Sequence, residues 1–171
     1  MFKHIPLVKT ALLGLAVCGA SQASAVEAFG NTYSAVAPVS AAQAQIVVFR
    51  PATLDSSTEA ANVYVDHEFH AALLPGGYSS FCVPAGKHAL NASLHDEPQY
   101  RGKTEGGEPV SLAGGLTYFL QVGEGVQQPA MFVRQDDAEH LLVNMRQQIQ
   151  ALSRASSVQA CLYQQQDGIA Q

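Results

Sequence analysis

Tryptophan is absent from this 171-residue chain, and charged residues make up only 13% of it, against 47% hydrophobic residues. This balance excludes a disordered polyelectrolyte, because such chains combine few apolar residues with a high net charge. Basic residues are scarce as well: nine Lys and Arg stand against fourteen Asp and Glu, for a formal net charge of −5. A chain of this sign has no general attraction for nucleic acid or for anionic lipid.

Motifs of common enzymes and cofactor sites are also missing. The chain has no Gly-x-Ser-x-Gly elbow, no P-loop and no dinucleotide fingerprint, and its glycine pairs, such as Gly76-Gly77 and Gly106-Gly107, are typical of turns. Carboxylates gather in one loop, at Asp96-Glu97 and at Glu105 and Glu108, where solvation is their ordinary role. The sequence therefore predicts a single domain that is not an enzyme and has no cofactor.

Residues 1–25 have the pattern of a secretory signal peptide. Lys3 and Lys9 give a basic start, residues 11–20 an apolar stretch too short to cross a bilayer, and Ala23-Ser24-Ala25 a cleavage site. Loss of the two lysines takes the net charge from −5 to −7. We expect an exported protein of the periplasm or the outer membrane surface, without a transmembrane segment in the mature chain.

Cys18 offers a rival reading of the same segment. In a lipoprotein this cysteine would become the lipidated N-terminus, but Val17 is larger than the Gly, Ala or Ser usual before it. We prefer the unlipidated form. Processing then leaves Cys82 and Cys161 in an oxidising compartment, where we expect them to form a disulfide. The alternative, a Cys82 nucleophile assisted by His88, lacks an orienting third group.

Residues 44–155 read as one mainly β domain. A buried first strand at residues 44–50 is followed by a β-meander over residues 61–94, with turns at Asp66-His67-Glu68, Pro75-Gly76-Gly77 and Pro84-Ala85-Gly86. Ala113-Gly114-Gly115 marks a second hairpin. We predict an antiparallel β-sandwich of about seven or eight strands.

A helix should close this domain, because the hydrophobic period changes after Asp136, the expected N-cap. One helical face carries six apolar residues: Ala138, Leu141, Leu142, Met145, Ile149 and Leu152. We expect this amphipathic α-helix to cover the sheet, with partner binding as the alternative. Residues 26–43 are expected to be a flexible linker, or a strand donated to a partner, and residues 156–171 a tail tied by Cys161.

Residues 95–109 form the longest predicted loop, and long loops often carry binding sites. This loop holds the densest basic cluster of the chain, Arg101 and Lys103, beside Tyr100. These three residues are candidates for binding an anionic polymer or a carboxylate, with the ring stacked on a sugar face. The alternative is that the two cations offset neighbouring acids.

His67 and His70 lie three residues apart near Asp66 and Glu68, which raises the question of a shared metal. Strand residues that face the same side are two apart, and no His-x-Glu-x-x-His or cysteine-rich set accompanies them. We therefore predict no metal and regard the histidines as part of a solvated hairpin tip.

The valine-rich strand at Val65, the Leu-Leu-Pro-Gly-Gly-Tyr connection and the Pro-Ala-Gly-Lys-His exit ending at His88 together resemble a bacterial envelope family of unknown function. That family occurs as small exported proteins or lipoproteins and ahead of OmpA-type domains. The pattern is also similar to PEGA-type sandwiches, although His67 replaces the turn glycine. Because no OmpA-type domain follows here, peptidoglycan binding is not carried over.

The resemblance and the absent motifs together imply a non-enzymatic accessory module of the cell envelope that binds an envelope protein or a cell-wall or surface polymer. The alternative is a periplasmic protein that binds a small ligand or a glycan through residues 95–109.

Overall fold

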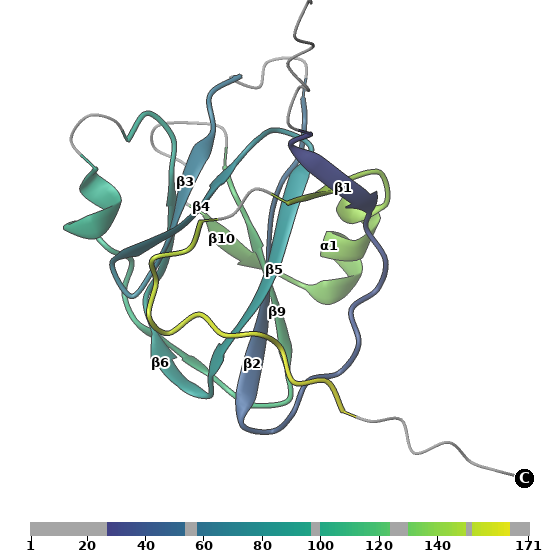
Figure 1. Ribbon diagram of the computed structural model, residues 1–171, viewed down its shortest axis with the longest axis vertical. Helices are drawn as coiled ribbons and strands as arrows, with labels where there is room; N and C mark the ends of the chain where they lie inside the picture. The colour runs from purple at the N-terminus through teal and green to yellow at the C-terminus, as the bar shows by residue number, and fades with distance from the viewer. Residues whose placement is uncertain (1–26, 54–57, 97–99, 124–129, 150–151, 165–171) are drawn as a thin grey trace, which may run out of the picture.

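The computed structural model describes residues 27–53, 58–96, 100–123, 130–149 and 152–164 (Figure 1). Within these ranges the protein is mainly β, with eleven strands and one α-helix. In chain order the elements are β1 (Phe29–Thr32), β2 (Gln43–Arg50), β3 (Ala61–Val65), β4 (Glu68–Leu73), β5 (Gly77–Pro84), β6 (Gly86–His88), β7 (Leu90–Ser93), the 3₁₀ turn η1 (Arg101–Lys103), β8 (Val110–Leu112), β9 (Thr117–Gln121), β10 (Met131–Val133), α1 (Gln135–Leu142) and β11 (Arg146–Gln148).

The strands form three sheets. Six of them lie in one sheet in the order β1-β11-β5-β2-β9-β10, a three-stranded sheet has the order β4-β3-β7, and β6 pairs with β8. The prediction of purely antiparallel pairing was wrong in the large sheet, because β2 runs parallel to β9 and β11 runs parallel to β5. The predicted turn at Asp66 is correct: Asp66 and His67 both adopt positive φ, at 51° and 67°, in the two-residue turn of the β3–β4 hairpin. The β-meander predicted over residues 61–94 was wrong beyond this hairpin, because β5 pairs with β2 and β7 pairs with β3. The hairpin predicted at Ala113-Gly114-Gly115 was wrong too, since β8 pairs with β6 and β9 pairs with β2 and β10.

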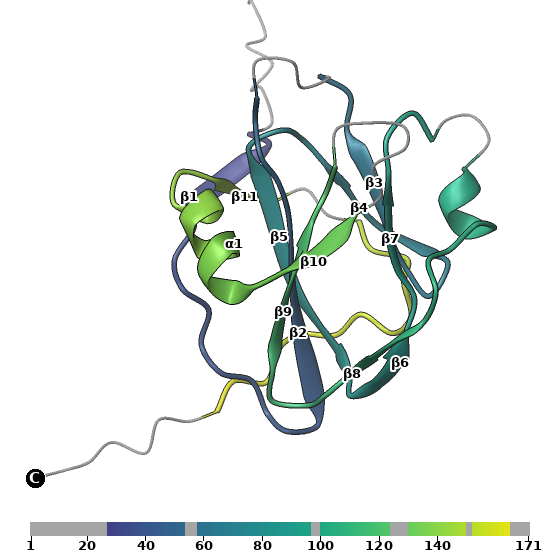
Figure 2. The same cartoon turned by 180° about the vertical axis from the view of Figure 1, so that it is seen from behind.

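Two apolar cores lie on opposite faces of the six-stranded sheet. Ile46 and Val48 face the three-stranded sheet and pack with Val63, Leu73 and Phe81. Their neighbours in β2 point the other way and pack with α1, which lies on the side of the large sheet away from β3 and β7 (Figure 2). This second core contains Val47, Phe49, Tyr78, Phe119, Ala138, Leu142 and Met145. Because side chains alternate along a strand, the single run of residues 46–49 supplies both cores.

The helix is much shorter than its apolar stripe predicted. It ends at Leu142, and the chain then returns to the sheet as β11, between β1 and β5. By pairing with β1 and β5, the backbone N–H and C=O groups of β11 gain the hydrogen bonds that a longer helix would have given them. Ile149 and Leu152, expected on the buried face, are 54% and 86% exposed. Arg134 occupies the N-cap position without a side-chain bond, and Asp136 lies in the first turn instead.

The segment expected to be a flexible linker, residues 26–43, is in large part built into the fold. Its β1 pairs with β11 at one edge of the large sheet, Val39 is fully buried, and Gln43 begins β2. Tyr33 and Val36 pack against the second core, which a free tether would not do. The predicted signal peptide, with Cys18, lies outside the described residues.

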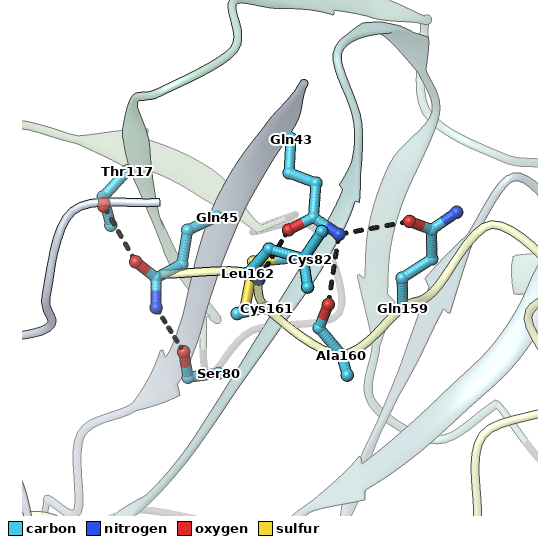
Figure 3. Close-up of a disulfide and its surroundings, with 9 residues drawn as sticks. All are labelled: Gln43, Gln45, Ser80, Cys82, Thr117, Gln159, Ala160, Cys161 and Leu162. Atoms are coloured by element: carbon cyan, nitrogen blue, oxygen red, sulfur yellow. Dashed lines mark hydrogen bonds between the residues drawn. A yellow bond between two sulfur atoms is a disulfide. The ribbon is translucent and has the colours of Figure 1, made fainter. Parts of the chain in front are cut away.

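A disulfide joins Cys82 in β5 to Cys161, as predicted (Figure 3). The amide of Gln159 donates to the carbonyl of Cys82 at 2.8 Å, so the chain before Cys161 runs along the edge of β5. Gln43 adds side-chain bonds to Ala160 and Leu162. We call residues 152–164 the C-terminal strap, which Figure 1 shows in yellow crossing in front of the sheets.

Reduction of this disulfide should lower the free energy of unfolding by about 4 kcal/mol, because the bond closes a loop with a sequence separation of 79 residues. Urea unfolding of the oxidised and reduced protein measures the difference. The Cys82→Ser, Cys161→Ser double variant is the control and should match the reduced protein, with no response to reductant. Equal midpoints for oxidised and reduced protein would contradict the prediction.

Neighbouring leucines on α1 test where the helix meets the sheet. Leu142→Ala should lower the free energy of unfolding by about 3 kcal/mol, because Leu142 is fully buried in the second core. Leu141→Ala makes the same chemical change at a side chain that is 44% exposed, and should cost less than about 0.5 kcal/mol. Similar losses for both variants in urea unfolding would show that the helix presents a different face.

Candidate functional site

The described residues of the loop, 95, 96 and 100–109, lie against the outer face of the three-stranded sheet, away from the apolar cores. Gly102 packs so closely on the ring of Tyr64 that a Cβ at this position would overlap it. Gly106 packs in the same way on the ring of His67, at the tip of the β3–β4 hairpin. The two glycines allow the loop to approach the sheet at distances that other residues would prevent.

Asp96 anchors this loop to the sheet. Its carboxylate is buried, accepts a short hydrogen bond from the hydroxyl of Tyr64, and accepts a second bond from the amide of Gly102 at 3.2 Å. Burial and the bond to Asp96 both raise the pKa of Tyr64, so the phenol stays protonated and remains a donor. A buried carboxylate needs such donors, and here they fix the start of the loop to its middle.

Two polar hollows lie beside this anchor. The first, of about 370 Å³, lies between the loop and the ends of β3 and β4, and is lined by Glu59, Ala60, Asn62, Ala72, His95 and Asp96. The second, of about 280 Å³, lies between the loop and β7, and is lined by Asn91, Ser93, Leu94, His95, Asp96, Arg101, Gly102 and Glu105. Both share His95 and Asp96, so these two residues form the wall between them.

The three residues predicted from the sequence occupy different places at this site. Arg101 lines the second hollow. Lys103 places its Nζ 5.1 Å from the centre of the Tyr100 ring, a cation–π arrangement on the surface of the loop. Tyr100 is 40% exposed and does not line either hollow. The structure therefore places Arg101 on the wall of a hollow and leaves Tyr100 and Lys103 as an exposed pair beside it.

Sequence reasoning missed the strand residues of the site. The pairing of β3 with β7 sets Asn62 opposite Ser93 and Tyr64 opposite Asn91, which puts four polar side chains on one face of the sheet. The alternation of these polar residues with apolar ones along each strand was the sequence signal that could have identified this face. Glu59 was also missed; its carboxylate lies 2.5 Å from Nδ1 of His95, and both residues line the first hollow. Contacts of this kind join distant segments and leave no local pattern.

A second polar cluster, on the other side of the hairpin, has the residues of a hydrolase triad in an arrangement unsuited to catalysis. The hydroxyl of Ser157 donates to Asp66 at 2.6 Å, and Nδ1 of His88 lies 2.8 Å from the same carboxylate oxygen. Nε2 of His88 is engaged with the carbonyl of Pro84 at 2.9 Å. Nucleophilic catalysis needs the hydroxyl beside the imidazole, so this cluster joins segments together and activates no nucleophile.

The histidines considered for a metal have separate surroundings. His67 packs on Gly106, whereas His70 is buried beside Phe81, with ring centroids 4.1 Å apart. Across the described parts of the chain, His, Cys, Asp and Glu form no group of three or more that could hold a metal ion. Cys82, which was considered as a nucleophile, is in the disulfide and has no free thiol.

Comparisons with known proteins give no match: no family model matches the chain, and no similar protein was found among curated proteins or solved structures. The described residues contain no helix long and apolar enough to cross a membrane.

Tyr64→Phe should loosen the loop, because it removes one of the donors to the buried Asp96. We expect a loss of about 1–3 kcal/mol in the free energy of unfolding and faster hydrogen exchange at the amide of Gly102. Tyr163→Phe is the matched control, since that ring is 53% exposed. The assignment of Asp96 as the anchor is rejected if Tyr64→Phe behaves like this control in both measurements.

Proposed function

We propose that this protein is a non-enzymatic accessory module of the bacterial cell envelope, exported to the periplasm or the outer membrane surface, and that it binds an envelope protein or polymer with residues 95–109. The observation that carries the proposal is the pair of polar hollows that this loop forms with the sheet, with Arg101 lining one of them and Tyr100 and Lys103 exposed beside it. The disulfide supports export, because such bonds persist in oxidising compartments.

The anchoring of the loop suits a binding role. A loop held by Asp96 and by close glycine contacts presents its exposed side chains without the ordering cost that a free segment incurs on binding. The resemblance to exported envelope proteins in the residues from Val65 to His88 is consistent with this role. We interpret the six-stranded and three-stranded sheets, which enclose the first core between them, as the two layers of a β-sandwich, with more strands than the seven or eight predicted.

The alternative function is binding of a small ligand or a glycan, and the lining of the hollows favours it. Asn62, Asn91 and Ser93 offer amide and hydroxyl groups, Glu59 and Asp96 offer carboxylates, and Arg101 offers a planar cation. Such groups hold sugar hydroxyls and carboxylates with directional hydrogen bonds. The exposed ring of Tyr100 provides an apolar face for stacking.

Replacement of the basic cluster tests both versions. Arg101→Ala with Lys103→Ala should weaken binding to immobilised polygalacturonate, an acidic polysaccharide, by about tenfold at low salt, and less at high salt, because exposed charges are screened. Tyr100→Ala should weaken binding at both salt concentrations. The control is Lys87→Ala with Arg134→Ala, which removes the same charge from exposed positions elsewhere.

Two further probes separate the two functions: dextran, a neutral polysaccharide to compare with polygalacturonate, and a pull-down of proteins from envelope extract. Binding to polysaccharide that depends on Arg101 and Tyr100 supports the glycan version. Loss of a captured envelope protein in the same variants, with thermal stability unchanged, supports the accessory module. If the loop variants bind every probe as the parent does, the proposed surface is wrong.

A further inference from the structure

His70 is a buried histidine whose ring has no hydrogen-bond partner in the described structure. It is 4% exposed, and neither Nδ1 nor Nε2 has a partner. The register of the hairpin explains its position: Val63 pairs with Ala71 but Tyr64 pairs with Phe69, so His70 is the extra residue of a β-bulge. Its ring lies against Phe81 of β5, in the space between the two sheets.

The C-terminal strap crosses this space. Its amide at Arg154 donates to the carbonyl of Phe69 at 2.8 Å, and its residue Gln159 exchanges backbone bonds with Cys82. These two anchor points are the neighbours of His70 in β4 and of Phe81 in β5. The strap therefore bridges β4 and β5 over the contact between the two rings, and Ala155, between the anchors, is buried in the first core.

Two carboxylates of the hairpin hold the same strap. Glu68 accepts from the amide and the hydroxyl of Ser156, at 2.6 and 2.7 Å, and Asp66 accepts from the hydroxyl of Ser157 at 2.6 Å. The disulfide at Cys161 keeps the far end of the strap attached. Hydrogen bonds thus hold one end of the strap, and a covalent bond holds the other.

We propose that the strap is an acid-operated latch: protonation of His70 favours a state in which residues 152–158 lift from the β4–β5 gap while Cys161 remains bound to Cys82. In the closed state the ring is buried and has no hydrogen-bond partner among the described residues, so a proton on it is costly. In the open state water reaches the ring, and the proton is accepted. Opening uncovers Phe81 and the edge of β5 near Cys82.

The acid range follows from the groups around the ring. Burial lowers the pKa of His70 from 6.5 to about 4, with no contribution from Tyr64, Asp66, Glu68 or Arg154 on the elements packed nearby. Protons therefore bind preferentially to the open state, so closure weakens as the pH falls from 6.5 to about 4.

The two carboxylates act at lower pH. Burial opposes ionisation of Asp66, but bonds from Ser157, His88 and the amide of Ala89 bring its pKa below the usual 3.8. The amide and hydroxyl of Ser156 hold the pKa of Glu68 below the usual 4.5. Their contribution to closure is present above those ordinary values and is lost only as the pH falls through the lowered ones. Among these three groups, whose pKa values the fold shifts, His70 is thus the one that responds at pH 5.

Hydrogen exchange of the full chain, corrected for the intrinsic effect of pH, tests the latch. The opening constant reported by the amides of Arg154 and Ser156 should rise about 30-fold between pH 8 and pH 5. At pH 8 these amides should also be less protected than the amide of Val122, which bonds to Phe49 beside the central strand. His70→Gln should abolish the rise, and His140→Gln, at an exposed histidine of α1, should leave it unchanged.

Three results would overturn the proposal. The first is exchange at Arg154 and Ser156 that does not change with pH. The second is equal protection of these amides and of Val122 at every pH, because the strap would then open only when the whole protein unfolds. The third needs no variant and remains decisive if His70→Gln does not fold: an NMR titration of the parent in which the His70 ring titrates near 6.5 in the closed state.

Discussion

Burial of β2 on both of its faces is the constraint on which the rest of the structure depends. Every residue from Gln43 to Arg50 is buried, which requires partners on both edges and cover on both faces. β5 and β9 supply the edges, the smaller sheet covers Ile46 and Val48, and α1 covers Val47 and Phe49. A strand buried in this way reads as a continuous apolar run, so its two-sided role was visible in the sequence but its neighbours were not.

The sequence predicted the features that depend on a few neighbouring residues or on residue type, namely the turns and the disulfide. The turns at Asp66 and at the glycine pairs follow from backbone conformations that few residues adopt, and the disulfide follows from two cysteines that an exported chain would retain. The helix failed as a prediction because periodicity cannot show where competing pairing begins. Residues 146–148 are more stable between β1 and β5 than as further helical turns, and only the three-dimensional neighbours reveal it.

The candidate site divides in the same way. Composition identified Arg101, Lys103 and Tyr100, because a basic cluster stands out in an acidic chain. The walls of the hollows were not predictable, since Asn62 and Ser93 become neighbours only through the register of β3 with β7. Gly102 and Gly106 looked like ordinary loop glycines, and their role is contact: one admits the ring of Tyr64 and the other the ring of His67.

The β3–β4 hairpin tip connects the candidate site to the strap. On one side His67 packs under Gly106 of the binding loop, and on the other Asp66 and Glu68 hold the serines of the strap. The turn has only two residues with positive φ, so its side chains are fixed relative to one another by a short and stiff piece of backbone. When the strap opens, the hydrogen bonds from Ser156 and Ser157 to the two carboxylates of this turn are lost. The contact of the neighbouring His67 with Gly106 in the binding loop is then the first to be affected. The polar hairpin tip, which the sequence suggested was simply solvated, is therefore the structural link between the two segments of the protein proposed to bind and to move.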